Sequence, residues 1–345
     1  MVEICFKTFD NLDAVIISNP ADIMFLTGFY CTDALCVKTN ELYLITDKRY
    51  TDEAQRAFSG KIIDEGSYIK NAAELILNSG GKNVGIQGGF LTAQDYIFLQ
   101  SKGFVITDIA NAMQQIRCHK NDEQITCILK AQSITEKAFE AILPRVKAGI
   151  SEKELRAQLE YYMFAFGADA VAFDSIVASG ENGACPHATP SERKLKQGDF
   201  ITFDFGAKIG GYCSDMTRTV ALGKVSDEQK TVYQTVLSAH EEAAKMLAPG
   251  VKCADVDAKA RQKLKKYDLD KFFTHSLGHG VGLEIHELPR LSQGANDVLA
   301  VGDVVTIEPG VYISGKMGVR IENMYVITAS GSVSLTKTDK KLINL

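Results

Sequence analysis

Four acidic residues stand inside runs of the chain that otherwise resemble buried β-strands. Asp204 lies in FITFDFG, Asp215 in YCSDMTRTV, Glu308 in VVTIEPGVY and Glu322 in GVRIENMYV. Their aromatic and β-branched neighbours predict burial, and a buried carboxylate is costly unless a cation or hydrogen bonds compensate it. The fold of this chain must therefore supply such compensation four times.

The spacing of these acids indicates a common site. Asp204 and Asp215 belong to strand-like runs at 200–206 and 212–220, which are joined through a Gly-Gly pair typical of a hairpin. Taken singly, Asp204 or Asp215 is better explained as a turn or salt-bridge residue, whereas the two together on one hairpin are equally well explained as metal ligands. If all four carboxylates converge, however, they cannot all stay ionised without nearby cations, and two divalent ions would balance their charge.

Three of the six histidines fall in the block THSLGHGVGLEIHELPR, at His275, His279 and His286. A lone histidine is usually a hydrogen-bonded structural residue, but three in a glycine-rich segment beside predicted buried acids favour a functional site. Carboxylate oxygens together with imidazole suit Mn²⁺ or Co²⁺ better than a structural thiolate zinc site, although zinc stays open.

The length of 345 residues predicts two domains, with a boundary in the charged segment 117–123. Residues 1–117 alternate strand-like and helical patterns, which predicts an α/β domain, and residues 118–345 predict an α+β domain with a mainly antiparallel sheet. The expected elements of the first domain are strands at 14–18, 34–38, 42–46, 61–64, 84–87 and 104–107 and helices at 47–58, 69–79 and 92–102. In the second domain, besides the hairpin above, they are helices at 122–147, from 151 onward, at 226–248 and at 252–267, and a strand pair at 304–308 and 318–327.

Composition excludes several classes of function. The 38 basic residues against 43 acidic ones give a net charge of −5, which does not support nucleic-acid binding. No secretory signal and no apolar run long enough to span a membrane is visible, so we expect a soluble protein with no membrane association. The eight cysteines form no CxxC pair, which predicts buried thiols in a reducing compartment, here the cytoplasm.

The acids and histidines in this order, within the phrases FDFG, SDMTRT, HSLGHGVGLEIHE, IEPGVY and GVRIEN, resemble the pita-bread metallopeptidases. Among these, the chain is most similar to the Xaa-Pro peptidases, prolidase and aminopeptidase P. The phrase NPADIMFLTGFY resembles their creatinase-like N-terminal domain, so the resemblance covers essentially the whole chain. It implies a creatinase-like domain at 1–117 and a pita-bread catalytic domain at 118–345.

The resemblance also implies a role for each ligand of two divalent ions. Asp204 would bind one ion, His279 and Glu308 the other, and Asp215 and Glu322 both. The two cations would activate a water molecule for attack on the scissile carbonyl, and Glu308 would exchange its proton.

Further residues receive roles from the same resemblance. His187 in CPHATPSER and His286 would contact the substrate carbonyl and stabilise the tetrahedral intermediate, although each is also explained as a loop-anchoring histidine. His275 would lie near the proline side of the substrate. Arg320 would orient the bridging carboxylate of Glu322 through a charge-assisted contact.

Arg290 in HELPRLS bears on the substrate. Some prolidases use an arginine at this position to hold the C-terminal carboxylate of a dipeptide, and a guanidinium is suited to that contact. A surface arginine after a proline turn is an equal alternative. The sequence thus favours an Xaa-Pro dipeptidase, with aminopeptidase P activity on longer peptides as the alternative.

Other members of this fold fit less well. Creatinase-like enzymes and peptide-binding members depart from the ligand set retained here, and methionine aminopeptidases usually lack the N-terminal domain. The resemblance implies a homodimer in which the N-terminal domain reaches the neighbouring subunit's site, with Phe29 and Tyr30 as candidates for that contact. Both residues are equally well explained as core or turn residues.

Overall fold

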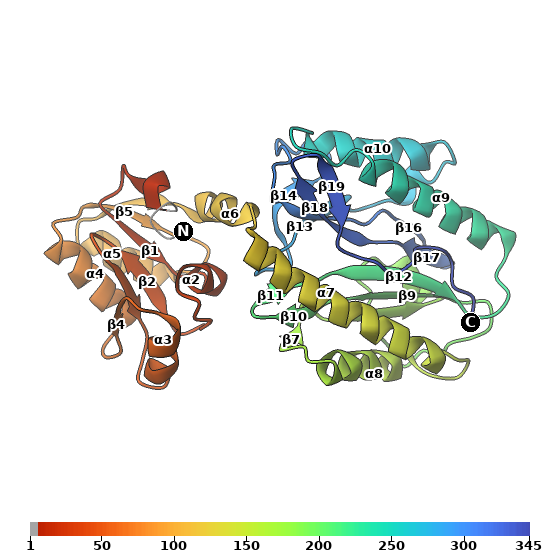
Figure 1. The fold of residues 1–345 in the computed structure, drawn as a ribbon, viewed down its shortest axis with the longest axis horizontal. Helices are drawn as coiled ribbons and strands as arrows, with labels where there is room; N and C mark the ends of the chain where they lie inside the picture. The colour runs from red at the N-terminus through yellow and green to blue at the C-terminus, as the bar shows by residue number, and fades with distance from the viewer. Residues whose placement is uncertain (1–5) are drawn as a thin grey trace. The chain divides into compact units, whose positions relative to one another are not determined.

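The computed structural model describes residues 6–345, and the chain divides into two compact units between Arg117 and Cys118. The N-terminal unit alternates strands and helices around a single mixed sheet (Figure 1). Its elements are η1 (Lys7–Phe9), β1 (Ala14–Ile17), α2 (Pro20–Thr27), β2 (Leu35–Lys38), β3 (Leu42–Ile45), α3 (Thr51–Ala57), β4 (Lys61–Ile63), α4 (Tyr68–Asn78), β5 (Asn83–Ile86), α5 (Ala93–Ser101), β6 (Val105–Asp108) and α6 (Ala110–Cys118).

The strands of this sheet lie in the order β4-β3-β2-β1-β5-β6. β2 runs antiparallel to β1 and β3, whereas β5 pairs parallel with both β1 and β6. Apolar residues of β1 and β2 are buried on both faces of the sheet, in two separate clusters. The predicted α/β class of this unit is confirmed.

Helix α2 is not among the elements expected from the sequence, although its ends carry clear signals. The side chain of Asn19 caps it, Pro20 begins it, and Gly28 ends it with a φ of 74°. Just beyond it, Phe29 is buried and contacts the Tyr50 ring edge-on, so the core explanation holds for Phe29. Tyr30 is exposed.

The C-terminal unit contains helix pairs and short antiparallel strands. Its helices are α7 (Asp122–Ile142), η2 (Leu143–Arg145), α8 (Glu152–Ala165), η3 (Asn182–Ala184), α9 (Asp227–Ala244), α10 (Cys253–Lys265) and η4 (Asp270–Phe272). Its strands are β7 (Ala170–Val171), β8 (Ile176–Ser179), β9 (Phe200–Phe205), β10 (Ala207–Ile209), β11 (Tyr212–Cys213), β12 (Met216–Ala221), β13 (Gly278–Gly280), β14 (Glu287–Leu291), β15 (Val304–Ile307), β16 (Gly310–Ile313), β17 (Met317–Arg320), β18 (Asn323–Thr328) and β19 (Gly331–Ser334).

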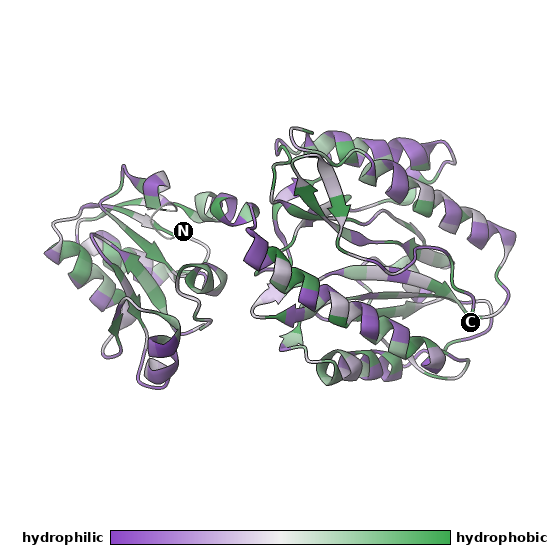
Figure 2. Ribbon diagram, viewed as in Figure 1, coloured by the Kyte–Doolittle hydropathy of each residue, from purple (hydrophilic) through white to green (hydrophobic). Residues whose placement is uncertain are grey.

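The strands of this unit lie between two helix pairs (Figure 1). Helices α7 and α8 pack on β8, β9 and β12 through one apolar cluster, and α9 and α10 pack on β15 to β18 through a second. Figure 2 shows hydrophobic residues along these strands and hydrophilic residues on stretches of α9 and α10. The α+β class and the antiparallel pairing predicted for this unit are confirmed.

The first predicted hairpin is present, with β9 paired to β12 and β10 paired to β11 around the two glycines. The second is split: β15 pairs with β18, while β16 pairs with β17 around residues 314–316. Pro309 follows β15 and cannot donate to a strand ladder, which explains the interruption. β13 and β14 were not expected, because β13 is Gly-His-Gly and β14 has a proline at its centre.

The cysteine prediction holds only in part. The seven cysteines among residues 6–345 are all free, and five are buried, but Cys127 is half-buried and Cys185 is exposed. Cys5 lies outside the described residues. Within 6–345, no helix combines the length and hydrophobicity that crossing a membrane requires.

Candidate metal centre

One cavity of about 360 Å³ in the C-terminal unit gathers the residues singled out from the sequence. All ten of them line it, and they come from segments far apart in the chain: His187, Asp204, Asp215, His275, His279, His286, Arg290, Glu308, Arg320 and Glu322. The volume is that of a small-ligand site.

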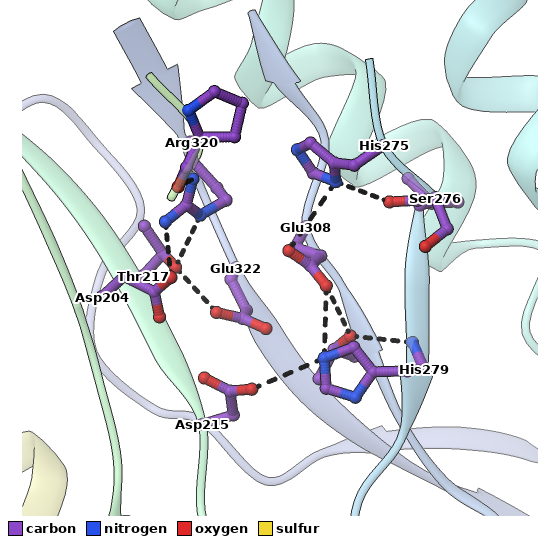
Figure 3. Close-up of polar contacts among 12 residues, drawn as sticks. Asp204, Asp215, Thr217, His275, Ser276, His279, Glu308, Arg320 and Glu322 are labelled. Atoms are coloured by element: carbon purple, nitrogen blue, oxygen red, sulfur yellow. Dashed lines mark hydrogen bonds and ion pairs between the residues drawn. The ribbon is translucent and has the colours of Figure 1, made fainter. Parts of the chain in front are cut away.

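Three of these residues form the compact centre of the cavity wall. One side-chain ligand atom from each of Asp215, His279 and Glu322 lies within 4.8 Å of the others, and all three residues are buried. Glu308 joins them, since its Oε1 lies 3.3 Å from His279 Nε2. Figure 3 shows the Asp215, Glu308 and Glu322 carboxylates directed toward this imidazole.

Strand ends position most of these acids. Asp204 lies within β9, as expected, but Asp215 lies just before β12, Glu308 just after β15, and Glu322 between β17 and β18. The expectation that all four stand inside strands is therefore wrong for three. Where a strand ends, the backbone leaves the ladder, so side chains from different sheets can converge at one point.

The imidazole of His279 is held with one nitrogen directed at the acids. Its Nδ1 lies 3.0 Å from the Gly280 carbonyl oxygen, to which it donates, so Nε2 is the nitrogen that faces Asp215 and Glu308. Burial acts to lower the pKa of His279, but the contact with Glu308, the charge of Glu322 and the hydrogen bond to Gly280 together outweigh burial and raise the pKa. The same contact lowers the pKa of Glu308 against the opposing effect of burial.

Two carboxylate oxygens of the cluster lack hydrogen-bond partners. Asp215 Oδ1 and Glu322 Oε1 are buried and receive no hydrogen bond from any described residue. Thr217 Oγ1 donates to the other Glu322 oxygen over 2.7 Å. Burial and the neighbouring acids raise the pKa of Glu322 to about 8 and that of Asp215 well above its usual value. Orphaned oxygens under mutual repulsion fit a site for divalent cations.

Arg320 makes the expected charge-assisted contact, but with Asp204 rather than Glu322. Its guanidinium contacts Asp204 Oδ2 and donates to Thr217 Oγ1 over 3.2 Å. It reaches Glu322 only through Thr217, which contacts both (Figure 3). Arg320, which was expected to orient Glu322, therefore connects Asp204 with Glu322 through Thr217.

A tyrosine that the sequence did not single out fixes His275. Tyr312 hydroxyl accepts from Arg320 Nη1 over 2.6 Å and donates to His275 Nε2 over 2.9 Å. His275 Nδ1 in turn donates to the carbonyl of Ser276 over 2.8 Å. Tyr312 is part of the phrase IEPGVY. Its role depends on its buried hydroxyl lying between His275 and Arg320, and the sequence does not show which side chains it contacts.

The remaining residues form the exposed rim of the cavity. His286 packs against the edge of the His279 ring, with 4.5 Å between ring centroids. His187 is exposed in the loop after η3, and Arg290 is exposed on β14. No acidic side chain within residues 6–345 forms an ion pair with the Arg290 guanidinium, which leaves it available to an anionic ligand.

Family models match both units. Residues 126–329 match the model of metallopeptidase family M24, and residues 9–119 match the creatinase/prolidase N-terminal domain. The chain belongs to metallopeptidase family M24. It is therefore a peptidase of a family that uses divalent metal ions, with a creatinase-type N-terminal domain and a pita-bread catalytic domain, as the sequence predicted.

The relatives of this M24 peptidase match two thirds or more of its length. It is 38% identical over 343 residues to the uncharacterized peptidase YqhT of Bacillus subtilis, covering 97% of this chain and 96% of that one. It is 42% identical over 235 residues to an Xaa-Pro dipeptidase of Pyrococcus furiosus, covering 68% of each chain.

Solved structures of both exopeptidase types superpose on this M24 peptidase. An Xaa-Pro dipeptidase from Bacillus anthracis matches with a TM-score of 0.96 and 35% identity, covering 100% of this chain and 99% of that one. An X-Pro aminopeptidase from Thermotoga maritima matches with a TM-score of 0.91 and 34% identity, covering 98% and 99%.

Proposed function

We propose that this protein is a dinuclear-metal Xaa-Pro dipeptidase. The observation that carries the proposal is the group of buried carboxylates in the wall of an open cavity, two of whose oxygens have no hydrogen-bond partner among residues 6–345, together with the exposed Arg290 at the rim. The metal centre accounts for hydrolysis, and the arginine for a substrate whose carboxylate lies next to the cleaved bond.

The described residues fit two divalent ions. Asp204 would hold one ion, and the orphaned oxygens of Asp215 and Glu322 suit ligands shared by two. His279 Nε2 and Glu308 would complete the second site. When bound, the ions would neutralise the carboxylates, polarise a carbonyl and lower the pKa of water. The single nitrogen among hard oxygen ligands favours Mn²⁺, with Co²⁺ and Zn²⁺ as the alternatives.

The other residues act on the substrate and its protons. Glu308 lies against His279 in the cavity wall, where its carboxylate would accept a proton from water and return it to the leaving proline nitrogen. His187 and His286 stand exposed at the rim, where ring N–H groups can donate to the developing oxyanion. The hydrogen bond from the Tyr312 hydroxyl keeps the His275 ring in one orientation on the cavity wall.

Arg290 decides between dipeptidase and aminopeptidase in this proposal. A free guanidinium at the rim would pair with the terminal carboxylate of an Xaa-Pro dipeptide, which a longer peptide carries farther away. Aminopeptidase P activity stays the second candidate, because the X-Pro aminopeptidase of Thermotoga maritima superposes nearly as well.

A rate panel tests the proposal. Chelated enzyme, reconstituted in turn with Mn²⁺, Co²⁺ and Zn²⁺, is assayed on an Xaa-Pro dipeptide, an Xaa-Pro-Yaa tripeptide and a proline-free dipeptide. We expect metal-dependent turnover with the Xaa-Pro dipeptide as the best substrate. Faster cleavage of the tripeptide would establish the aminopeptidase, and metal-independent turnover would overturn both.

We also propose that the enzyme is a cytoplasmic homodimer. The free cysteines among residues 6–345 support a reducing compartment, and the exposed Tyr30 supports a contact made by the N-terminal domain. Sedimentation equilibrium of the wild type and of Tyr30→Ala tests the oligomeric state and this contact.

A further inference from the structure

A fully buried glutamate lies outside the metal centre, in the first turn of α8. Glu152 has 0% of its surface exposed. No lysine, arginine or histidine within residues 6–345 forms an ion pair with it. A buried carboxylate without a cation is costly unless hydrogen bonds compensate it.

Five donors supply this bonding, and they come from the two ends of one loop. Glu152 Oε1 accepts from the backbone N–H and the hydroxyl of Ser179, both over 2.7 Å. Oε2 accepts from the Asn182 side chain over 2.8 Å, and from the Ser191 N–H and hydroxyl over 2.9 and 2.7 Å. One carboxylate therefore closes the loop 180–190 at its base.

Arg193 orients the two serine hydroxyl groups that donate to Glu152. Its Nη1 donates to Ser179 Oγ over 2.8 Å, and its backbone N–H donates to Ser191 Oγ over 3.1 Å. Each hydroxyl therefore accepts from Arg193 and gives its only proton to Glu152. All five groups around Glu152 are donors. A glutamine at this position would therefore direct the N–H groups of its amide at other N–H or O–H donors, whichever way the amide is turned.

The far part of the loop is fixed at the metal centre. A Cβ on Gly318 of β17 would lie 1.7 Å from the Gly183 carbonyl oxygen, so the two backbones are in direct contact. Arg320 Nη1 donates to the Pro186 carbonyl over 3.2 Å. Pro186 and His187, the next residue, both line the cavity.

We infer that Glu152 is a positioning residue that sets the place of His187 in the cavity by clamping loop 180–190. The inference rests on the proposed function, in which His187 contacts the substrate. Glu152 touches neither substrate nor metal. It acts only through the loop, whose base it holds while Arg320 holds its far part.

The test compares Glu152→Gln with Glu154→Gln, a matched control in the same helical turn. Glu154 caps α8 through Ser151 and is exposed, so its substitution removes the same charge without touching the loop. We expect Glu152→Gln to lower kcat/KM for the Xaa-Pro dipeptide about 10- to 100-fold, the scale of a displaced substrate-contacting group. Amide hydrogen exchange of 179–191 should accelerate in this variant and stay unchanged in Glu154→Gln.

A cycle with His187→Ala separates positioning from general damage. If Glu152 acts through His187, Glu152→Gln costs nothing further in the His187→Ala background. An equal loss in both backgrounds, or exchange spread beyond the loop, overturns the inference. Should Glu152→Gln not fold, Asn182→Ala removes one of the five donors to Glu152. It is then combined with His187→Ala in the same way, and a smaller loss of kcat/KM is expected. Failure of the proposed function is distinct, because the wild type would then show no metal-dependent Xaa-Pro hydrolysis.

Discussion

The two units of the molecule treat buried acids differently. In the N-terminal unit, Asp22 is fully buried but pairs with Arg117 over 2.6 Å and accepts from the side chain of Gln87. In the C-terminal unit, Asp215 and Glu322 are also buried, and each keeps an oxygen without a hydrogen-bond partner in the described part of the chain. Residues of its own unit therefore balance Asp22, whereas Asp215 and Glu322 are suited to balance by bound cations.

The hydrogen bonds around Glu152 show that burial alone does not explain this difference. Glu152 is in the same unit as the metal centre and is as buried as Asp215, yet five donors surround it. A buried acid surrounded by donors supports the fold, and a buried acid facing other acids indicates a cation site. The number of donors therefore distinguishes structural from functional carboxylates in this protein.

The largest expected effect is on turnover. Asp215→Asn and Glu322→Gln each remove a shared metal ligand, and we expect each to lower kcat for an Xaa-Pro dipeptide by about 10³-fold, the scale of losing one strong electrostatic contact at a reacting centre. Asp227→Asn, at an exposed position at the start of α9, is the matched control and should keep full activity. Near-normal turnover in Asp215→Asn would remove that residue from the centre.

Stability without metal should respond differently to the loss of a buried acid in the two units. In the presence of chelator, Asp215→Asn should leave the free energy of unfolding unchanged or higher, because it removes a buried acid that faces other acids. Asp22→Asn should lower it by about 3 kcal/mol, the cost of breaking a buried ion pair. Urea unfolding followed by circular dichroism measures both. Equal destabilisation would show that the two kinds of buried acid do not differ.

The metal-free protein should lose stability as pH rises. Glu322 has a pKa of about 8 when folded, against 4.5 for an ordinary glutamate, so between these values the folded state holds a proton that the unfolded state has released. Stability then falls with rising pH from about 5 to about 8, at up to about 1.4 kcal/mol per pH unit for one proton. Glu322→Gln should flatten this dependence in chelator-treated samples, and an unchanged slope in that variant would contradict the assignment.

The smallest effect is expected at the rim. Arg290→Ala should raise KM for an Xaa-Pro dipeptide about tenfold, the value of one charged contact, and change KM for an Xaa-Pro-Yaa tripeptide less. Arg290→Lys should restore part of the loss, because it retains the charge without the fork geometry. Equal effects on both peptides would favour the aminopeptidase.

The sequence predicted the parts of this molecule that local pattern determines. Alternating apolar residues around a Gly-Gly turn predicted the β9 and β12 pairing, and charged residues inside such runs pointed to the acids that line the cavity. Helix α2 was missed despite its Asn-Pro start and glycine end, since its interior is too uniformly apolar to show a helical face.

Long-range contacts could not be read in the same way. Glu152 and Glu154 look alike in the sequence, as two acids in the first turn of a capped helix. Yet Glu152 is buried and holds a loop, whereas Glu154 is exposed. Likewise, nothing local indicates that Arg320 contacts Asp204 across 116 positions. Such partners depend on how distant strands meet, which hydrophobic pattern alone does not fix.

Calorimetric titration of Mn²⁺ into the chelated enzyme tests the central claim most directly. Repeating the titration in buffers of different ionisation enthalpy reports the protons released on binding. The wild type should bind two ions per chain and release protons, as carboxylates of raised pKa become ligands, and Asp215→Asn should bind fewer or more weakly. The absence of saturable binding to the wild type, or full Xaa-Pro turnover with no divalent ion bound, would contradict the account.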